Sequence, residues 1–126
     1  MSDRKNCPAR SVETILKVIT KRWTLQILFD MFCGKKHFNE FQEDKPKLLN
    51  KSLSRRLQEL EENGLIKKEI KDNTTEYYLT DEGRLLNKVI YELMMYSIKR
   101  DVNGEYFSED TKEYMINEAK KQLDID

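Results

Sequence analysis

Hydrophobic side chains recur at the spacing of an amphipathic helix near the N-terminus of the chain. Val12, Ile15, Leu16 and Ile19 follow the i, i+3, i+4, i+7 rule, and Ser11 stands before them as a candidate N-cap. The pattern therefore predicts a first helix that begins at Ser11.

A second helix is predicted from about Trp23 to Cys33, because apolar residues occupy more than one side of that stretch. Gly34 follows it, in position for the left-handed conformation that ends many helices. A short helical segment comes next, from His37 to about Glu43, before Pro46 breaks the chain. We expect the second helix to be the most buried of these elements.

The stretch KSLSRRLQELEENGLI, residues 51–66, combines an apolar stripe with a polar face. Leu53, Leu57 and Leu60 are spaced by four and three residues, so they lie on one side of a helix and predict its core face. The side chains that flank this stripe or project away from it are all hydrogen-bonding groups: Lys51, Ser52, Ser54, Arg55, Arg56 and Gln58.

After Gly64 the apolar period changes from that of a helix to that of a strand. Alternating residues in LIKKEIK and TEYYLT predict two strands, and residues 72–74 between them tolerate a tight turn. The sequence therefore predicts a β-hairpin, whose arms carry Lys67, Lys68 and Lys71.

Two further helices are predicted after the hairpin. Thr80 is placed to cap a long helix from Asp81 to Ile98, and a last helix runs roughly from Thr111 to Leu123. The long helix has a wider apolar surface than so small a domain can cover, which predicts a C2 homodimer. Its interface is expected to combine the first, long and last helices through Val12, Leu16, Leu86, Val89, Ile90, Leu93, Met94, Met115 and Ala119.

The order of these elements is that of a winged helix-turn-helix, a mainly α fold with a small β-hairpin and flanking helices at both ends. In this architecture the helix before the hairpin enters the major groove of DNA, and residues near its N-terminal end meet base edges. The hairpin lysines are expected to lie where a wing contacts backbone phosphates.

Charge supports this interpretation only after the chain is divided. The formal net charge is zero, but residues 1–80 carry +4 and residues 81–126 carry −4. Residues 45–58 hold five cations and no acid, whereas three glutamates lie near the C-terminal end of the helix predicted in residues 51–66. That order is unfavourable for the helix dipole, so we expect a partner outside the helix to bind its positively charged end.

Length and composition set the remaining bounds. A chain of 126 residues predicts one compact domain, and neither a membrane span nor a signal peptide is recognised, so a cytoplasmic location is expected. We find no nucleophile elbow, phosphate-binding loop or metalloprotease motif, so neither an enzyme nor a cofactor is predicted.

Three residues with reactive or ligating side chains need separate interpretation. His37 is the only histidine and has no second ligand at metal-site spacing, so a surface or phosphate-facing role is favoured and no metal is predicted. Cys33 is expected to be a buried, inert thiol. Cys7 lies in a polar arm with three cations, which lower the pKa of a thiol, although an ordinary unreactive cysteine is equally consistent with the sequence.

Five short motifs follow one another along the chain: CP at 7–8, KRWTLQIL at 21–28, GKKHFNEF at 34–41, LSRRLQELEENGLI at 53–66 and EYYLTDEG at 76–83. In order and spacing they resemble the HxlR-type winged helix-turn-helix regulators of bacteria and archaea. They cover roughly residues 7–96, which leaves residues 97–126 as a C-terminal helical extension.

The resemblance implies a homodimeric transcriptional regulator that binds a double-stranded, pseudo-palindromic DNA operator. It implies that residues 53–63 form the recognition helix. Some members of the family sense an oxidant or electrophile through an N-terminal cysteine at the place of Cys7. The chain departs from the family at His37, where an arginine is usual, and at Leu49, where Ser or Thr is usual, so Asn50 is expected to take over the cap. The wing lacks a proline-rich stretch and is expected to be short.

Two other functions remain open at this point. One is a regulator that is switched between two DNA-binding geometries by modification of Cys7. The other is a winged-helix module that binds a protein and has given up DNA. The acid-free window of residues 45–58 argues against the second, and salt-dependent DNA binding distinguishes it from a DNA reader.

Overall fold

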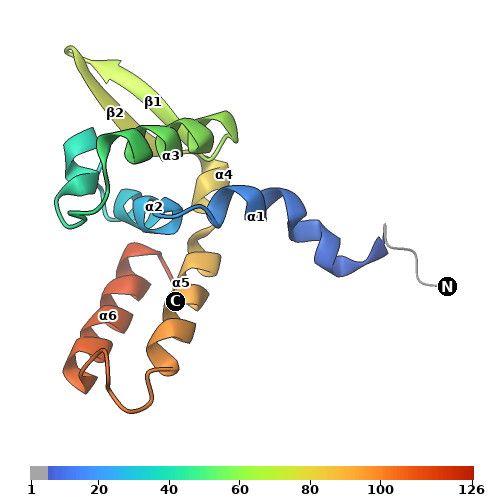
Figure 1. Cartoon of the computed structure of the whole chain (residues 1–126), viewed down its shortest axis with the longest axis vertical. Helices are drawn as coiled ribbons and strands as arrows, with labels where there is room; N and C mark the ends of the chain where they lie inside the picture. The colour runs from blue at the N-terminus through green and yellow to red at the C-terminus, as the bar shows by residue number, and fades with distance from the viewer. Residues whose placement is uncertain (1–5) are drawn as a thin grey trace.

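The structure, a computed structural model, describes residues 6–126 and is mainly helical with one two-stranded antiparallel hairpin (Figure 1). None of the helices in this part of the chain has the length and apolar composition that crossing a bilayer requires. The elements are the 3-10 helix η2 (Pro8–Val12), α1 (Glu13–Ile19), α2 (Thr24–Phe32), the 3-10 helix η3 (Phe38–Gln42), α3 (Asn50–Glu62), β1 (Ile66–Lys71), β2 (Thr74–Leu79), α4 (Asp81–Arg84), α5 (Asn87–Lys99) and α6 (Glu109–Gln122).

The core of residues 24–79 lies between α2, η3, α3 and the base of the hairpin. Ile27, Leu28 and Phe41 have no exposed surface, and neither do Leu53 and Leu60 of the predicted leucine stripe. The stripe is therefore confirmed as the core face of α3, and the opposite face of that helix is left to solvent.

The predicted hairpin is confirmed, but its turn has two residues and not three, because Thr74 already pairs with Lys71 in the sheet. Asp72 and Asn73 have φ values of +50° and +65°, the left-handed pair that matches the twist of two-residue hairpin turns. Pairing runs from Ile66 opposite Leu79 to Lys71 opposite Thr74. The base of the hairpin packs in the core and its tip projects away from the body, at the end of the molecule opposite α5 and α6 (Figure 1).

The predicted long helix from Asp81 to Ile98 is wrong in one respect, because it is broken in two. Thr80 does cap α4, and its hydroxyl accepts a hydrogen bond from the Gly83 amide at 3.1 Å. A Cβ at Gly83 would lie 2.0 Å from the Leu65 carbonyl oxygen, so α4 is held directly against the hairpin base. Two turn residues, Leu85 and Leu86, separate α4 from α5, and α5 packs on α6 (Figure 1).

Two predicted N-caps are also wrong. Ser11 lies inside η2, because the proline at the start of that 3-10 helix begins the turn earlier and leads it directly into α1. Leu49 is the N-cap of α3 and makes no side-chain cap bond, while Asn50 is already helical. The Asn50 side chain instead accepts a hydrogen bond from Gln42 Nε2 at 2.6 Å.

The residues predicted at a dimer interface divide into three groups by exposure. Ile90 and Ala119 are each only 2% exposed and belong to the core of their own chain, because α6 packs over α5, so they are removed from the predicted interface. Leu86, Met94 and Met115 are partly buried against the same core. The residues that remain exposed are Val12, Leu16, Val89 and Leu93.

Candidate nucleic-acid interface

The outward face of α3 carries two cations that no carboxylate in the described residues neutralises. Lys51 and Arg55 are one helical turn apart, both are exposed, and neither takes part in an ion pair within residues 6–126. Like charges at this spacing destabilise a helix by roughly 0.2–0.5 kcal/mol. Ser54 and Gln58 are exposed on the same helix. This face therefore concentrates positive charge and hydrogen-bonding groups without a stabilising role in the fold.

Arg56 lies beside the leucine stripe and is committed to its own helix. Its Nε atom is 2.7 Å from Oε1 of Glu59, and its side chain is 14% exposed. The partner of Arg56 in this structure is therefore an acid of the same helix. Gln58 is similarly engaged, because its Nε2 donates to Glu62 Oε1 at 3.1 Å.

His37 stands at the start of η3 and faces the wing. Its backbone N–H donates to Glu40 Oε1 at 2.8 Å, and its Nε2 is 3.8 Å from Oε2 of Glu76. The Lys36 and His37 backbone N–H groups hold the pKa of Glu40 below its usual value. Glu40 therefore caps the start of η3. Glu76 is the carboxylate next to the His37 imidazole.

One face of the wing is largely neutralised by its own acids. Lys71 Nζ lies 3.5 Å from Glu69 Oε2 and 3.7 Å from Glu76 Oε1, and Lys67 Nζ lies 3.6 Å from Glu69 Oε1. The Tyr78 hydroxyl donates to Glu76 and lowers the pKa of that carboxyl, with help from nearby Lys36 and Lys71, so Glu76 stays ionised.

Lys68 belongs to the other face of the wing, because strand side chains alternate. It is exposed, and it joins no ion pair in the part of the chain that the structure describes. It is therefore the wing lysine most available to a phosphate.

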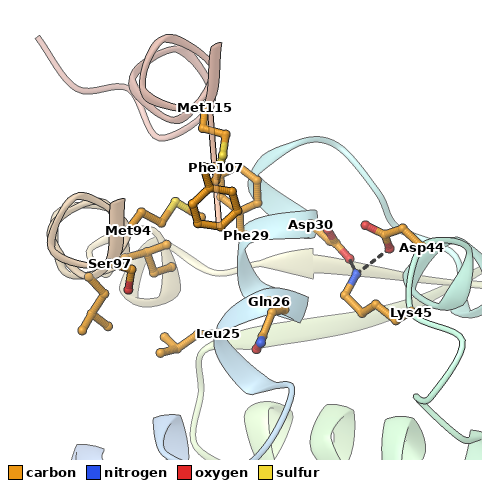
Figure 2. A pocket seen from close by; sticks show the side chains of 12 residues that line it. Leu25, Gln26, Phe29, Asp30, Asp44, Lys45, Met94, Ser97, Phe107 and Met115 are labelled. Carbon is orange, nitrogen blue, oxygen red and sulfur yellow. Dashed lines mark hydrogen bonds and ion pairs between the residues drawn. The ribbon is translucent and has the colours of Figure 1, made fainter. Parts of the chain in front are cut away.

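Lys45 belongs to the core although it opens the acid-free window. Its ammonium group lies between the carboxylates of Asp30 and Asp44, 2.8 Å from Oδ1 of Asp44 and in direct contact with Asp30 (Figure 2). Lys45 and Asp30 are 7% and 6% exposed, and burial raises the pKa of Asp30. The cations of the window that remain on the surface without a carboxylate partner in residues 6–126 are Lys47, Lys51 and Arg55.

An apolar pocket of about 420 Å³ lies beside this cluster, between α2, α5 and α6. Figure 2 shows Phe29, Met94, Phe107 and Met115 gathered on one side of it. Leu93 lines this pocket and also a shallow hollow formed with Val89 and Tyr96 on α5. The apolar surface of α5 therefore continues from the exposed helix face into the pocket.

Both cysteines are exposed, so the prediction of a buried Cys33 is wrong. Cys33 follows the last residue of α2, where the chain turns outward toward Gly34. Partial burial and the Asp30 carboxylate raise the pKa of its thiol, which disfavours the reactive thiolate. Cys7 is the N-cap of η2. Residues 6–126 contain no group of three His, Cys, Asp or Glu side chains that could hold a metal.

A sequence model described as HxlR-like helix-turn-helix matches residues 18–103, which is more than half of the chain. The chain belongs to this family. The HTH-type transcriptional regulator YdeP of Bacillus subtilis is 38% identical over 94 residues, covering 72% of this chain and 71% of that protein. This confirms the resemblance seen in the sequence motifs.

Two solved structures are also similar. The redox regulator HypR in its reduced form is 33% identical, with a TM-score of 0.68 over 76% of this chain and 99% of that one. The quinone-bound YodB of B. subtilis is 30% identical, with a TM-score of 0.63 over 74% of this chain and 99% of that one. The protein is therefore a transcriptional regulator with a helix-turn-helix domain, and its relatives are regulators and not enzymes.

Proposed function

We propose that this regulator binds a specific double-stranded DNA operator as a homodimer, with the start of α3 in the major groove and the hairpin against the backbone. The observation that carries the proposal is the exposed pair Lys51 and Arg55, which has no carboxylate partner within residues 6–126. A guanidinium can donate two hydrogen bonds to a guanine edge, and an ammonium group is attracted to phosphate.

The proposed contacts follow from exposure and pairing. Lys51, Ser54, Arg55 and Gln58 face the groove, with Asn50 and Ser52 at its edge. Lys68 is the principal phosphate contact of the wing, and Lys67 and Lys71 contribute after release from their glutamates. His37 lies against Glu76 of the wing and Arg56 is paired with Glu59 of its own helix, so neither reads a base in this proposal. Residues 7–96 form the DNA-binding domain in this proposal, and residues 97–126 extend the part that dimerises.

The proposed dimer is built from α1 and α5. η2 and α1 project from the body in Figure 1, and Val12 and Leu16 on them are 43% and 42% exposed. Val89 and Leu93 expose a second apolar strip on α5 that continues into the pocket. Two copies related by a two-fold axis would cover both strips and would read a pseudo-palindromic operator.

Light scattering tests the assembly. The wild type is expected to be a dimer at micromolar concentration, and Leu93→Glu is expected to be a folded monomer because a charge then faces the apolar seam. Val102→Glu is the matched control, since Val102 is 79% exposed in the segment between α5 and α6. A monomeric wild type would refute the dimer.

Selection of fragments from a random DNA pool tests the DNA-binding part. The protein is expected to enrich one motif with two half-sites about one helical turn apart or a multiple of that spacing. Its affinity for that motif is expected to fall steeply with salt, because bound cations release counterions from the phosphates. Recovery of no motif, with salt-independent binding, would favour the protein-interaction module instead.

A second candidate function is redox sensing through Cys7. The exposure of this thiol favours it, as do relatives described as a redox regulator and as a quinone-bound regulator. A peroxide would oxidise the Cys7 thiolate to a sulfenic acid, and a thiol from a second copy would then displace water to form a disulfide.

Iodoacetamide labelling separates the two thiols. Cys7 is expected to react well before Cys33, whose pKa is raised, and Cys33→Ser should leave the fast reaction intact. Oxidant should then change DNA binding in the wild type and in Cys33→Ser, but not in Cys7→Ser. Equal labelling of the two cysteines would remove the basis for this candidate.

A further inference from the structure

Leu49 occupies a position that a leucine does not favour. It is the N-cap of α3, where Ser, Thr, Asp or Asn would accept a hydrogen bond from the first amides of the helix. Its side chain provides no acceptor, and it is 67% exposed. A single exposed leucine is ordinary, but Leu49 neither caps the helix nor buries its side chain.

The adjacent leucine shows the contrast. Leu48 is 3% exposed and holds the preceding loop in the core, whereas Leu49 has extended backbone angles of φ −79° and ψ 154°. Successive side chains of an extended segment point to opposite sides, so anchoring Leu48 directs Leu49 outward. It therefore lies directly beside the exposed start of α3, next to Asn50 and Lys51.

The surroundings of Leu49 are those of the proposed DNA face and not of the proposed dimer seam. The apolar strips assigned to the dimer lie on η2, α1 and α5, whereas Leu49 stands within the window of Lys47, Lys51 and Arg55. In the major groove, the apolar group on a base edge is the C5-methyl of thymine. That methyl is the group in such a site that an exposed leucine can desolvate.

We propose that Leu49 contacts a thymine methyl in each operator half-site and thereby selects a T·A pair beside the bases that Lys51 and Arg55 read. This inference rests on the proposed DNA-binding function and adds an apolar reader to its polar ones. The missing cap then lowers the stability of α3, and the leucine in its place contributes to base recognition.

Replacement of thymine by deoxyuridine tests the contact, because deoxyuridine pairs in the same way and lacks only the methyl. Each thymine of one selected half-site is replaced in turn, and affinity is measured by fluorescence anisotropy with the full-length chain. Wild type is expected to lose about fourfold at one position, the ratio that burial of one methyl-sized group gives. Leu49→Ser and Leu49→Ala are expected to lose nothing at that position.

Two controls separate recognition from folding. Val102→Ser, which removes an equally exposed apolar side chain far along the chain, should keep the fourfold loss of the wild type. Leu49→Ser should raise Tm by about 3 °C, because serine supplies the missing cap, whereas Leu49→Ala should not.

The outcomes are distinguishable from those of the parent proposal. Specific binding without any deoxyuridine effect, or with the same effect in Leu49→Ser and Leu49→Ala as in the wild type, overturns the Leu49 contact alone. A lower Tm in Leu49→Ser also overturns it, because Leu49 would then serve the fold. Failure of the wild type to bind a selected motif overturns the proposed function itself.

Discussion

The start of α3 and the wing each carry three cations, but they use them differently. On α3, Lys51 and Arg55 have no carboxylate partner in the described residues, and only Arg56 is paired. On the wing, Lys67 and Lys71 both pair with Glu69 of their own strand, and Lys71 also pairs with Glu76 of the partner strand, so only Lys68 has no carboxylate partner in the described residues. The two regions have the same number of positive residues. They differ in how many of those residues are already paired with a carboxylate.

The difference bears on DNA affinity. Exposed ion pairs are worth roughly 0–1 kcal/mol, so a phosphate can displace Glu69 from the wing lysines at modest cost. Each displaced pair nevertheless reduces the net gain from that contact. We therefore expect α3 to supply most of the affinity and the selectivity, with the wing adding a smaller, sequence-independent part.

The largest expected effect concerns Lys45, which shares the acid-free window but lies in the core. Lys45→Ala leaves Asp30 buried without its main partner, so it should lower the free energy of unfolding by about 3–5 kcal/mol, measured by urea denaturation. Lys47→Ala is the control, because Lys47 is exposed and joins no ion pair in residues 6–126. Lys47→Ala should keep its stability. If Lys45→Ala were equally stable, Lys45 would be a surface cation.

The next effect compares two neighbouring lysines of the wing. Lys68→Ala should reduce the slope of log affinity against log salt by about 0.9, the value for one lost phosphate contact on duplex DNA. Lys67→Ala should change that slope by less, because Lys67 starts from an ion pair with Glu69. Both variants should weaken operator and random DNA alike. Equal slope changes would show that the wing pairs have no influence on DNA binding.

The smallest effect is expected at Arg56. Arg56→Ala should lower stability by about 1 kcal/mol through loss of the Glu59 pair, and it should leave the ratio of operator to random affinity unchanged. Chemical denaturation and anisotropy on both DNAs check the two halves of this prediction. A fall in the ratio would make Arg56 a base reader and would reverse its assignment relative to Arg55.

Local patterns were enough to predict much of the fold. Spacing alone predicted the leucine stripe of α3, and alternation with turn-forming residues predicted the hairpin, with a turn over residues 72–74 that is one residue longer than the observed turn at Asp72 and Asn73. The ion pairs of the wing lysines could also have been predicted from the sequence. A two-residue turn places Glu69 opposite Glu76, and Lys67 and Lys71 alternate onto their face.

The features that sequence reasoning missed depend on contacts between distant residues. Asp30 and Lys45 are 15 positions apart and meet only when the loop before α3 folds against α2. The contact of α4 with the hairpin base depends on the close approach of Gly83 to Leu65, and the burial of Ile90 depends on the packing of α6 over α5. No local sequence pattern predicts which distant residues come into contact. The buried and the exposed residues of one apolar or cationic segment therefore could not be distinguished from the sequence.

The most direct test of the account is the ratio of operator to random-DNA affinity in Arg55→Ala, measured at several salt concentrations. Circular dichroism and light scattering first establish that the variant is folded and has the oligomeric state of the wild type. We predict that the ratio falls roughly tenfold or more, because a guanidinium on a base edge discriminates by about 1–3 kcal/mol. An unchanged ratio in the folded variant would contradict the claim that the unpaired cations of α3 read the operator.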